Sequence, residues 1–141
     1  MTNKQERDMK RVTFVVAVLC ATLFMTSCDK SGKKAIAVAD SFLSSYFKMD
    51  YEKAASYCSQ EISEMLLEAV EDKDDLPDEI LDKMAEASSS TTYEIVGIDD
   101  ETLEDCVLVQ YEVRPANAER PIVKTMYVSK FDEEWKITSL K

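Results

Sequence analysis

The spacing of apolar residues changes once along this chain, and the change limits the folds that it can adopt. Up to the serine–threonine run at residues 88–92, apolar residues recur every three or four positions, as on one face of an α-helix. Beyond that run they alternate with polar residues, as in strands that bury one face. Helices followed by consecutive strands are typical of an α+β domain, in which the helices pack on one face of an antiparallel sheet.

Helical spacing predicts where the helices lie. Asp50 is placed to cap the second of them, and Pro77 suits the first turn of the last one. Residues 71–75 (EDKDD) are expected to form a solvated loop between helices. The predicted helical segments are residues 36–47, 51–58, 62–70 and 77–87. Residues 62–70 either continue the helix of 51–58 after a bend or form a new one.

The alternating half predicts a curled antiparallel meander of about four strands, because its segments follow one another with short connections. Gly97 lies inside the first segment and suggests a β-bulge. The third and fourth segments are joined tightly around residues 131–133. The predicted strands are residues 92–98, 106–113, 122–130 and 134–140.

The first residues have the three zones of an export signal. A polar, basic segment at 1–11 precedes an apolar run from Val12 to Met25, and small residues then lead to Cys28. The 14-residue run makes about 21 Å of helix, too short for roughly 30 Å of hydrocarbon. It also has no polar face, which argues against a buried core helix. Residues 1–27 are therefore interpreted as a signal peptide.

Residues 23–28 (LFMTSC) resemble the lipobox of bacterial lipoproteins, in which the cysteine is acylated and becomes the mature N-terminus. Thr26 and Ser27 fit that pattern, whereas Met25 stands where leucine is usual. The resemblance implies a thioether-linked diacylglycerol on Cys28, and two or more acyl chains anchor a protein stably to a membrane. A plain secretory signal beside an ordinary cysteine is the alternative.

This interpretation divides the chain into a signal peptide (1–27), a lipidated tether (28–34) and an α+β domain (35–141). The protein is expected to be lipid-anchored in a bacterial cell envelope. The residues after Cys28 (DKSGKK) lack the acidic run that some similar lipoproteins use for surface display, so a periplasm-facing location is favoured.

Two further motifs resemble the nuclear-transport-factor-two-like (cystatin-like) superfamily. They are residues 39–54 (ADSFLSSYFKMDYEKA) and the terminal residues 134–137 (EWKI), which are similar to segments of small lipoproteins of unknown function. Glu134 departs from the glycine that many members carry before the tryptophan. Over roughly residues 33–141, the resemblance implies a cone-shaped fold, in which a curved sheet wraps around the first helix.

In that fold a cavity lies at the open end of the cone and takes a small molecule or a peptide. Ordinary core packing is the alternative role for aromatic residues at such positions. The residues that the resemblance places around this cavity are Phe42, Tyr46, Tyr111, Tyr127 and Trp135.

Enzymatic relatives place a carboxylate and tyrosines inside the cone. Asp40, Asp50 and Glu94 are the carboxylates beside apolar faces here. Capping explains Asp50, helix solvation explains Asp40, and the chain has no histidine to shuttle protons near neutral pH. The expected function is therefore binding without catalysis, and an isomerase- or hydrolase-like enzyme is the weakest alternative.

The cysteines fall into two pairs. Cys20 leaves with the signal peptide and Cys28 receives lipid, so Cys58 and Cys106 remain in the domain. The periplasm permits a disulfide between them, and two separate buried thiols are the alternative. With no histidine and no CxxC motif, the sequence gives no sign of a zinc or haem site, and no cofactor or metal is expected.

The charge of the mature chain excludes some partners. The signal peptide has a net charge of +2, so its removal changes the formal net charge from −11 to −13. A domain this acidic and without a basic stripe does not bind nucleic acid through its charge.

The densest charge lies between Glu61 and Glu86, with eleven carboxylates and two lysines. The segment lacks the EF-hand calcium pattern, because Leu76 stands where an oxygen ligand should be and Pro77 replaces the turn glycine. A solvated face is one interpretation of this run, and a docking surface for a basic partner is the other.

Overall fold

The computed structural model describes residues 30–141, and residues Ser31–Lys141 form one compact unit. The predicted signal peptide (1–27) and the predicted lipidation site, Cys28, lie outside the described residues. None of the helices within residues 30–141 is long and apolar enough to cross a membrane. In chain order the elements are α2 (Lys30–Phe47), α3 (Tyr51–Ser56), α4 (Gln60–Asp74), α5 (Asp78–Ser89), β1 (Thr92–Leu103), β2 (Cys106–Arg114), β3 (Ile122–Phe131) and β4 (Glu134–Leu140).

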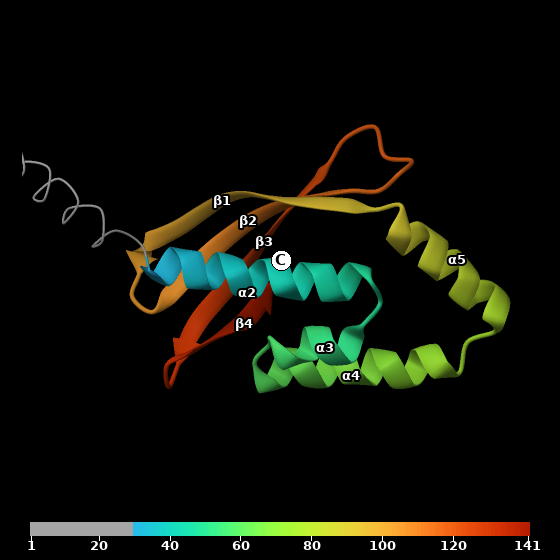
Figure 1. Ribbon diagram of the computed structural model, residues 1–141, viewed down its shortest axis with the longest axis horizontal. Coiled ribbons are helices and arrows are strands. Elements are labelled where there is room, and N and C mark those ends of the chain that lie inside the picture. Colours follow the sequence, from blue (N-terminus) through green and yellow to red (C-terminus); the bar gives the residue numbers. More distant parts are fainter. Residues whose placement is uncertain (1–29) are drawn as a thin grey trace, which may run out of the picture. The chain divides into compact units, whose positions relative to one another are not determined.

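The four strands form one antiparallel sheet in the order β1-β2-β3-β4 (Figure 1). Each strand pairs with the next along the chain, and Figure 1 shows their directions rotating steadily across the sheet. The four helices of residues 30–141 precede all the strands of this part of the chain. The expected α+β class, with helices followed by a curled four-stranded meander, is confirmed.

Gly97 lies at the bulge that its position in the strand predicts. The register of β1 against β2 shifts between Ile95 and Gly97, so Val96 is the extra residue. A Cβ atom on Gly97 would lie 3.4 Å from Oε1 of Gln110, in ordinary van der Waals contact. The bulge therefore displaces the register without requiring glycine for space.

The core lies between α2 and the inner face of the sheet. Phe42 and Leu43 on α2 are almost fully buried, at 2% and 1% exposure. Alternate residues of β2 and β3 meet them, so one face of each strand points inward and the other outward. The buried strand residues are Val107, Val109, Tyr111, Val113, Met126, Val128, Trp135 and Ile137. Within the described residues, the buried core residues lie between Ala35 and Ile137.

The short helix α3 joins the helices to the free edge of β4. The Ser59 amide donates to the Ile137 carbonyl at 2.8 Å, and the Ile137 amide donates to the Tyr57 carbonyl at 2.9 Å. At the other end of α3, the Lys53 amide donates to the Asp50 carboxylate at 3.2 Å, which confirms the predicted cap. These contacts cover an edge that would otherwise present unpaired backbone groups.

Three predicted boundaries are wrong. Residues 30–34, expected in the tether, form the first turns of α2, because the alanine-rich stretch that follows favours helix and extends it backwards. The acidic residues 71–74, expected in a loop, are the last turn of α4. Strand β1 runs on to Leu103, because its ladder resumes beyond a second irregularity at Asp99, whose carboxylate accepts the Thr102 amide at 3.1 Å.

The β3–β4 hairpin turns through two residues in the left-handed region, Asp132 (φ 44°) and Glu133 (φ 72°). Such turns favour glycine, because a side chain in this region costs about 1–2 kcal/mol. We expect Glu133→Gly to raise the free energy of unfolding by about 0.5–1 kcal/mol. This is the strain relieved in the folded turn, less the extra conformational entropy that glycine loses on folding. Urea unfolding of the domain would measure the change.

The same substitution at an ordinary backbone position is the control. Glu119 has no positive φ, so Glu119→Gly should give no gain. The ion pair from Glu133 to Lys130, at 3.4 Å, is highly exposed on the glutamate side, so its loss subtracts little. A lower stability for Glu133→Gly would show that the turn does not strain this residue.

Candidate functional site

Aromatic rings cluster at the C-terminal half of α2. The Tyr46 ring lies 5.7 Å from Phe42, 5.4 Å from Phe47 and 5.5 Å from Tyr51, measured between centroids. The Phe47 ring stacks on Tyr93 of β1 at 5.6 Å. These spacings are those of packed aromatic pairs, which fix the end of α2 against the start of the sheet.

Phenol groups approach one another in this cluster. Burial raises the pKa of the Tyr51 and Tyr111 hydroxyls, and the Tyr46 phenol beside them raises it further. Burial also raises the pKa of Tyr93, with the Asp40 carboxylate as the next cause. All three groups are therefore neutral donors across the physiological pH range.

The structure brings three of the five predicted cavity residues together. Phe42, Tyr46 and Tyr111 belong to one cluster, and Trp135 lies in the same core. Phe42, Tyr111 and Trp135 are 2%, 6% and 8% exposed, so their side chains are enclosed by other parts of the domain. Tyr46 is more open, at 38%. Phe42, Tyr111 and Trp135 therefore pack in the hydrophobic core, which was the alternative to lining a cavity.

The prediction for Tyr127 is wrong. Met126 and Val128 point into the core, and the alternation of a strand therefore turns Tyr127 to the opposite face of the sheet. There Nζ of Lys141 lies 5.1 Å from the centre of the Tyr127 ring. Tyr127 cannot share a site with the aromatic cluster, because the sheet itself separates them.

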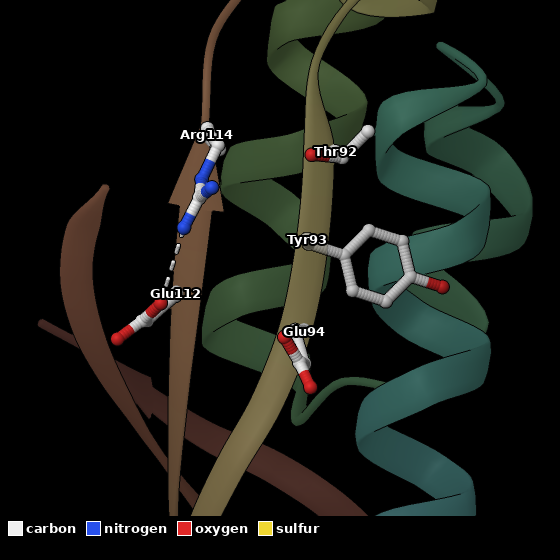
Figure 2. Close-up of a pocket in the computed structure, with 5 residues that line it drawn as sticks. All are labelled: Thr92, Tyr93, Glu94, Glu112 and Arg114. Atoms are coloured by element: carbon white, nitrogen blue, oxygen red, sulfur yellow. Dashed lines mark ion pairs between the residues drawn. The ribbon is translucent and has the colours of Figure 1, made fainter. Parts of the chain in front are cut away.

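A hollow of about 320 Å³ opens beside the start of β1 (Figure 2). Figure 2 shows Tyr93 turned towards α2, with Glu112 and Arg114 on the neighbouring strand. Glu94 lies directly across from Glu112 in the ladder, and Nη2 of Arg114 is 4.0 Å from Oε2 of Glu112. The hollow thus offers a mixed-charge, open surface, and none of the five predicted aromatic residues lines it.

A second hollow, of about 350 Å³, lies between the end of α2 and the end of α5. Ser88 crosses this junction, and its hydroxyl donates to the Phe47 carbonyl at 2.5 Å. Tyr93 borders both hollows. The sequence pattern did not single out Tyr93, although the alternation within β1 could have placed it on the inner face.

The candidate catalytic carboxylates lie at the surface, and two of them have structural roles. Asp40 accepts a hydrogen bond from the Tyr93 hydroxyl at 3.1 Å, and Asp50 caps α3. Glu94 faces another glutamate across the ladder. All three residues are exposed.

Cys58 and Cys106 are both free thiols, so the disulfide considered from the sequence is not formed. Cys58 pairs with Ile137 beside β4, whereas Cys106 begins β2. Three strand spacings separate these positions, roughly 14 Å across the sheet, while a disulfide needs Cα atoms within about 7 Å. The Cys58 thiol donates to the Ala54 carbonyl instead, and Cys106 accepts from the Ser129 hydroxyl.

We expect the two thiols to differ in reactivity. Cys58 is buried, and burial raises its pKa to about 12, which suppresses the reactive thiolate. Cys106 is only partly buried and should react first with iodoacetamide in the folded domain. Mass spectrometry should then find both cysteines alkylated after unfolding without reductant. Protection of both until a reductant is added would contradict the free-thiol arrangement.

Helix α5 has an apolar side but no buried residue. Ile80 is 40% exposed, and Leu81 and Met84 beside it are only partly covered. Leu76, just before the helix, is also exposed. An apolar helix face is normally covered by the core, but no residue of α5 is buried, so α5 presents a surface that the described domain leaves open.

Carboxylates surround this open surface. We call residues 60–89, which comprise α4, the following turn and α5, the α4–α5 arm. It carries the eleven carboxylates and two lysines noted in the sequence. Within the described residues, no three potential ligands gather in a way that could hold a metal ion. The acidic charge is therefore distributed along two helices.

Residues 30–141 therefore form an α+β domain, with four helices followed by a four-stranded antiparallel meander. No protein-family model and no curated protein matches the chain. A similar solved structure is an NTF2-like protein of unknown function from Cytophaga hutchinsonii. It is 9% identical, with a TM-score of 0.39, and the match covers 74% of this chain and 87% of that one.

Proposed function

We propose that this chain is a lipid-anchored accessory protein of the bacterial cell envelope, facing the periplasm, which acts without catalysis by binding another protein through α5. One observation carries the binding part of the proposal. Helix α5 has an apolar side, yet it contributes no residue to the core.

The anchor is supported by the sequence of the first 28 residues. A basic segment, a short apolar run and the lipobox-like residues 23–28 are the features that export and acylation require. Cys28 precedes the first residue of α2, Lys30, by only two positions. A lipid on Cys28 would therefore hold the domain close to the bilayer.

Protein binding is favoured over capture of a small molecule inside the cone. The predicted cavity residues Phe42, Tyr111 and Trp135 are packed in the core, and Tyr127 lies on the other side of the sheet. Apolar surface that remains available for a partner is found on α5 instead, where Ile80 is 40% exposed. Exposed apolar residues rimmed by polar ones are typical of interaction surfaces.

Native purification with the lipid intact, followed by mass spectrometry, tests this proposal when wild type is compared with matched variants. The α5 variant carries Ile80→Ser and Met84→Ser, and the control carries Val123→Ser at an exposed position on β3. We expect a protein that co-purifies with wild type and the control to be depleted at least about tenfold with the α5 variant. Equal recovery with all three proteins, or no reproducible partner, would overturn the proposal.

A further inference from the structure

We infer that α5 unfolds and refolds on its own while the rest of the domain stays folded, and that a partner on its apolar side holds it in the helical form. The part played by the partner rests on the proposed function. The local opening itself follows from three features of residues 75–91: the absence of core packing, hydrogen bonds that end within the segment, and the short length of the helix.

Helix α5 lacks the core packing that stabilises the other long helices. Within residues 30–141, none of its residues is buried, and none belongs to the core or to the partly buried residues packed against it. By contrast, α2 buries Phe42 and Leu43, and α4 buries Ile62 and Leu66. Because most of the stability of a helix in a protein comes from packing its apolar side, α5 is held less firmly than its neighbours.

The side-chain hydrogen bonds of this segment mostly end within it. Among the described residues, one side-chain bond joins α5 to another element, from the Ser88 hydroxyl to the Phe47 carbonyl of α2 at 2.5 Å. A hollow of about 350 Å³ opens beside this bond. The side chains that donate to atoms of α5 itself are those of Lys83, Ser89, Ser90 and Thr91.

The helix is also too short to be stable by itself. It has 12 residues, and isolated helices shorter than about 12–15 residues are marginal in water. Pro77 at its start provides no side-chain cap, and its last turn has no basic residue to interact with the carbonyl end. The hydroxyls of Ser89 and Ser90 donate to carbonyls of the last turn, which weakens a helix slightly.

The segments on either side of α5 are fixed independently of it. Figure 1 shows α5 running from the end of α4 to the start of β1. Lys73 near the end of α4 lies over the Tyr51 ring, and Thr92 at the start of β1 pairs with Arg114 in the ladder. An extended chain is longer per residue than a helix, so the opened segment still spans the distance between these ends. The opening therefore breaks no contact of the core.

A partner that covers the apolar side opposes this opening. Ile80 and Met84 are four positions apart, so they share one side only while α5 is helical. A ligand that binds one of two states shifts the population towards that state. Binding at this side therefore also folds α5, and the apparent affinity falls with the fraction of molecules that are open.

Hydrogen exchange, measured by mass spectrometry, tests the local opening. The chain is purified with its lipid and placed in nanodiscs, so that no detergent covers the apolar side. We expect the amides of residues 80–89 to exchange at most about a hundredfold more slowly than in an unstructured peptide. The amides of β2 and β3 should exchange at least about a thousandfold more slowly. Equal protection of α5 and these strands would overturn the inference.

Two matched variants show whether the opening is confined to α5. Ala85 on α5 and Ala37 on α2 are both exposed within a helix, where replacing alanine with glycine disfavours the helical state about fivefold. Ala85→Gly should speed exchange in α5 about fivefold. Ala37→Gly should speed exchange in β2 and β3 about fivefold and leave α5 unchanged. Equally faster exchange in α5 and the strands with Ala37→Gly would show that α5 opens only when the whole domain unfolds.

The same measurement on the complex obtained by native purification tests the part played by the partner. Exchange in α5 should be at least about tenfold slower in the complex than in the chain alone, with β2 unchanged. A complex that forms through α5 without slowing its exchange would overturn this part of the inference.

The two proposals can fail separately. If α5 exchanges only together with β2 and β3, the inference is wrong, and binding through α5 is still decided by native purification. If α5 opens on its own, but no co-purifying protein depends on Ile80 and Met84, the proposed function is wrong and the local opening stands.

Discussion

Replacing Phe42 with alanine should lower the free energy of unfolding of the domain by about 3–5 kcal/mol, a large part of the stability of a typical domain. Phe42 is 2% exposed and stacks on Tyr46 at 5.7 Å. Its removal leaves a cavity between α2 and the sheet, because the strands on the other side are held in a continuous ladder. Urea unfolding, followed by the fluorescence of Trp135, measures the effect.

The matched control is Phe131→Ala, which makes the same substitution at a 54% exposed position at the end of β3. Because little of that ring is removed from water by folding, we expect a loss of about 1 kcal/mol or less. If the two variants lost the same stability, α2 would not be packed on the sheet in the way described.

Cys28→Ser should reduce the covalent incorporation of a labelled fatty acid to background. A serine hydroxyl cannot form the thioether that the lipobox resemblance implies. Cys20→Ser is the matched control, because Cys20 lies within the apolar run of the predicted signal peptide and should not affect labelling. In-gel detection of an alkyne fatty acid in cells that produce each variant measures the result.

Two outcomes would contradict the lipid anchor. One is a Cys28→Ser variant that is still labelled, which would place the acyl group elsewhere. The other is a wild-type protein whose N-terminal peptide begins at Met1 and carries no acyl mass. Either result would leave the α+β domain unchanged and would remove the membrane attachment from the proposed function.

The element order could be predicted from the sequence because each half of the chain has one dominant period. Apolar residues at three- and four-residue spacing gave the helices, and alternation such as Val107, Val109 and Tyr111 gave the inner face of β2. The bulge at Gly97 and the cap at Asp50 were also predicted, since both depend on local backbone chemistry.

The ends of the helices and strands were harder to predict than their order. Contacts with other parts of the domain extend a helix or strand beyond the residues whose sequence pattern predicts it. Helix α2 begins at Lys30, although the residues before Ala35 have no apolar pattern. Helix α4 runs to Asp74 through an acidic stretch that reads as a loop. There Lys73 lies over the Tyr51 ring, a contact between residues that are far apart in the chain.

The candidate site was only partly visible in the sequence. Alternation alone separates Tyr111, which points inward, from Tyr127, which points outward, so the error in grouping them was avoidable. The uncovered face of α5 was not predictable in the same way. An amphipathic pattern predicts that a helix buries one side, and only the arrangement of the whole domain shows that Ile80 finds no core to cover it.

Photo-crosslinking in cells tests the central claim most directly, because it asks what contacts α5 in the intact envelope. A benzophenone amino acid replaces Ile80 (40% exposed) in one variant and Val123 on β3 (53% exposed) in another. We expect irradiation to give a discrete adduct of higher mass from position 80 and none from position 123. An adduct from position 123 but not from 80, the same adducts from both, or none from either would contradict the assignment of α5 as the binding surface.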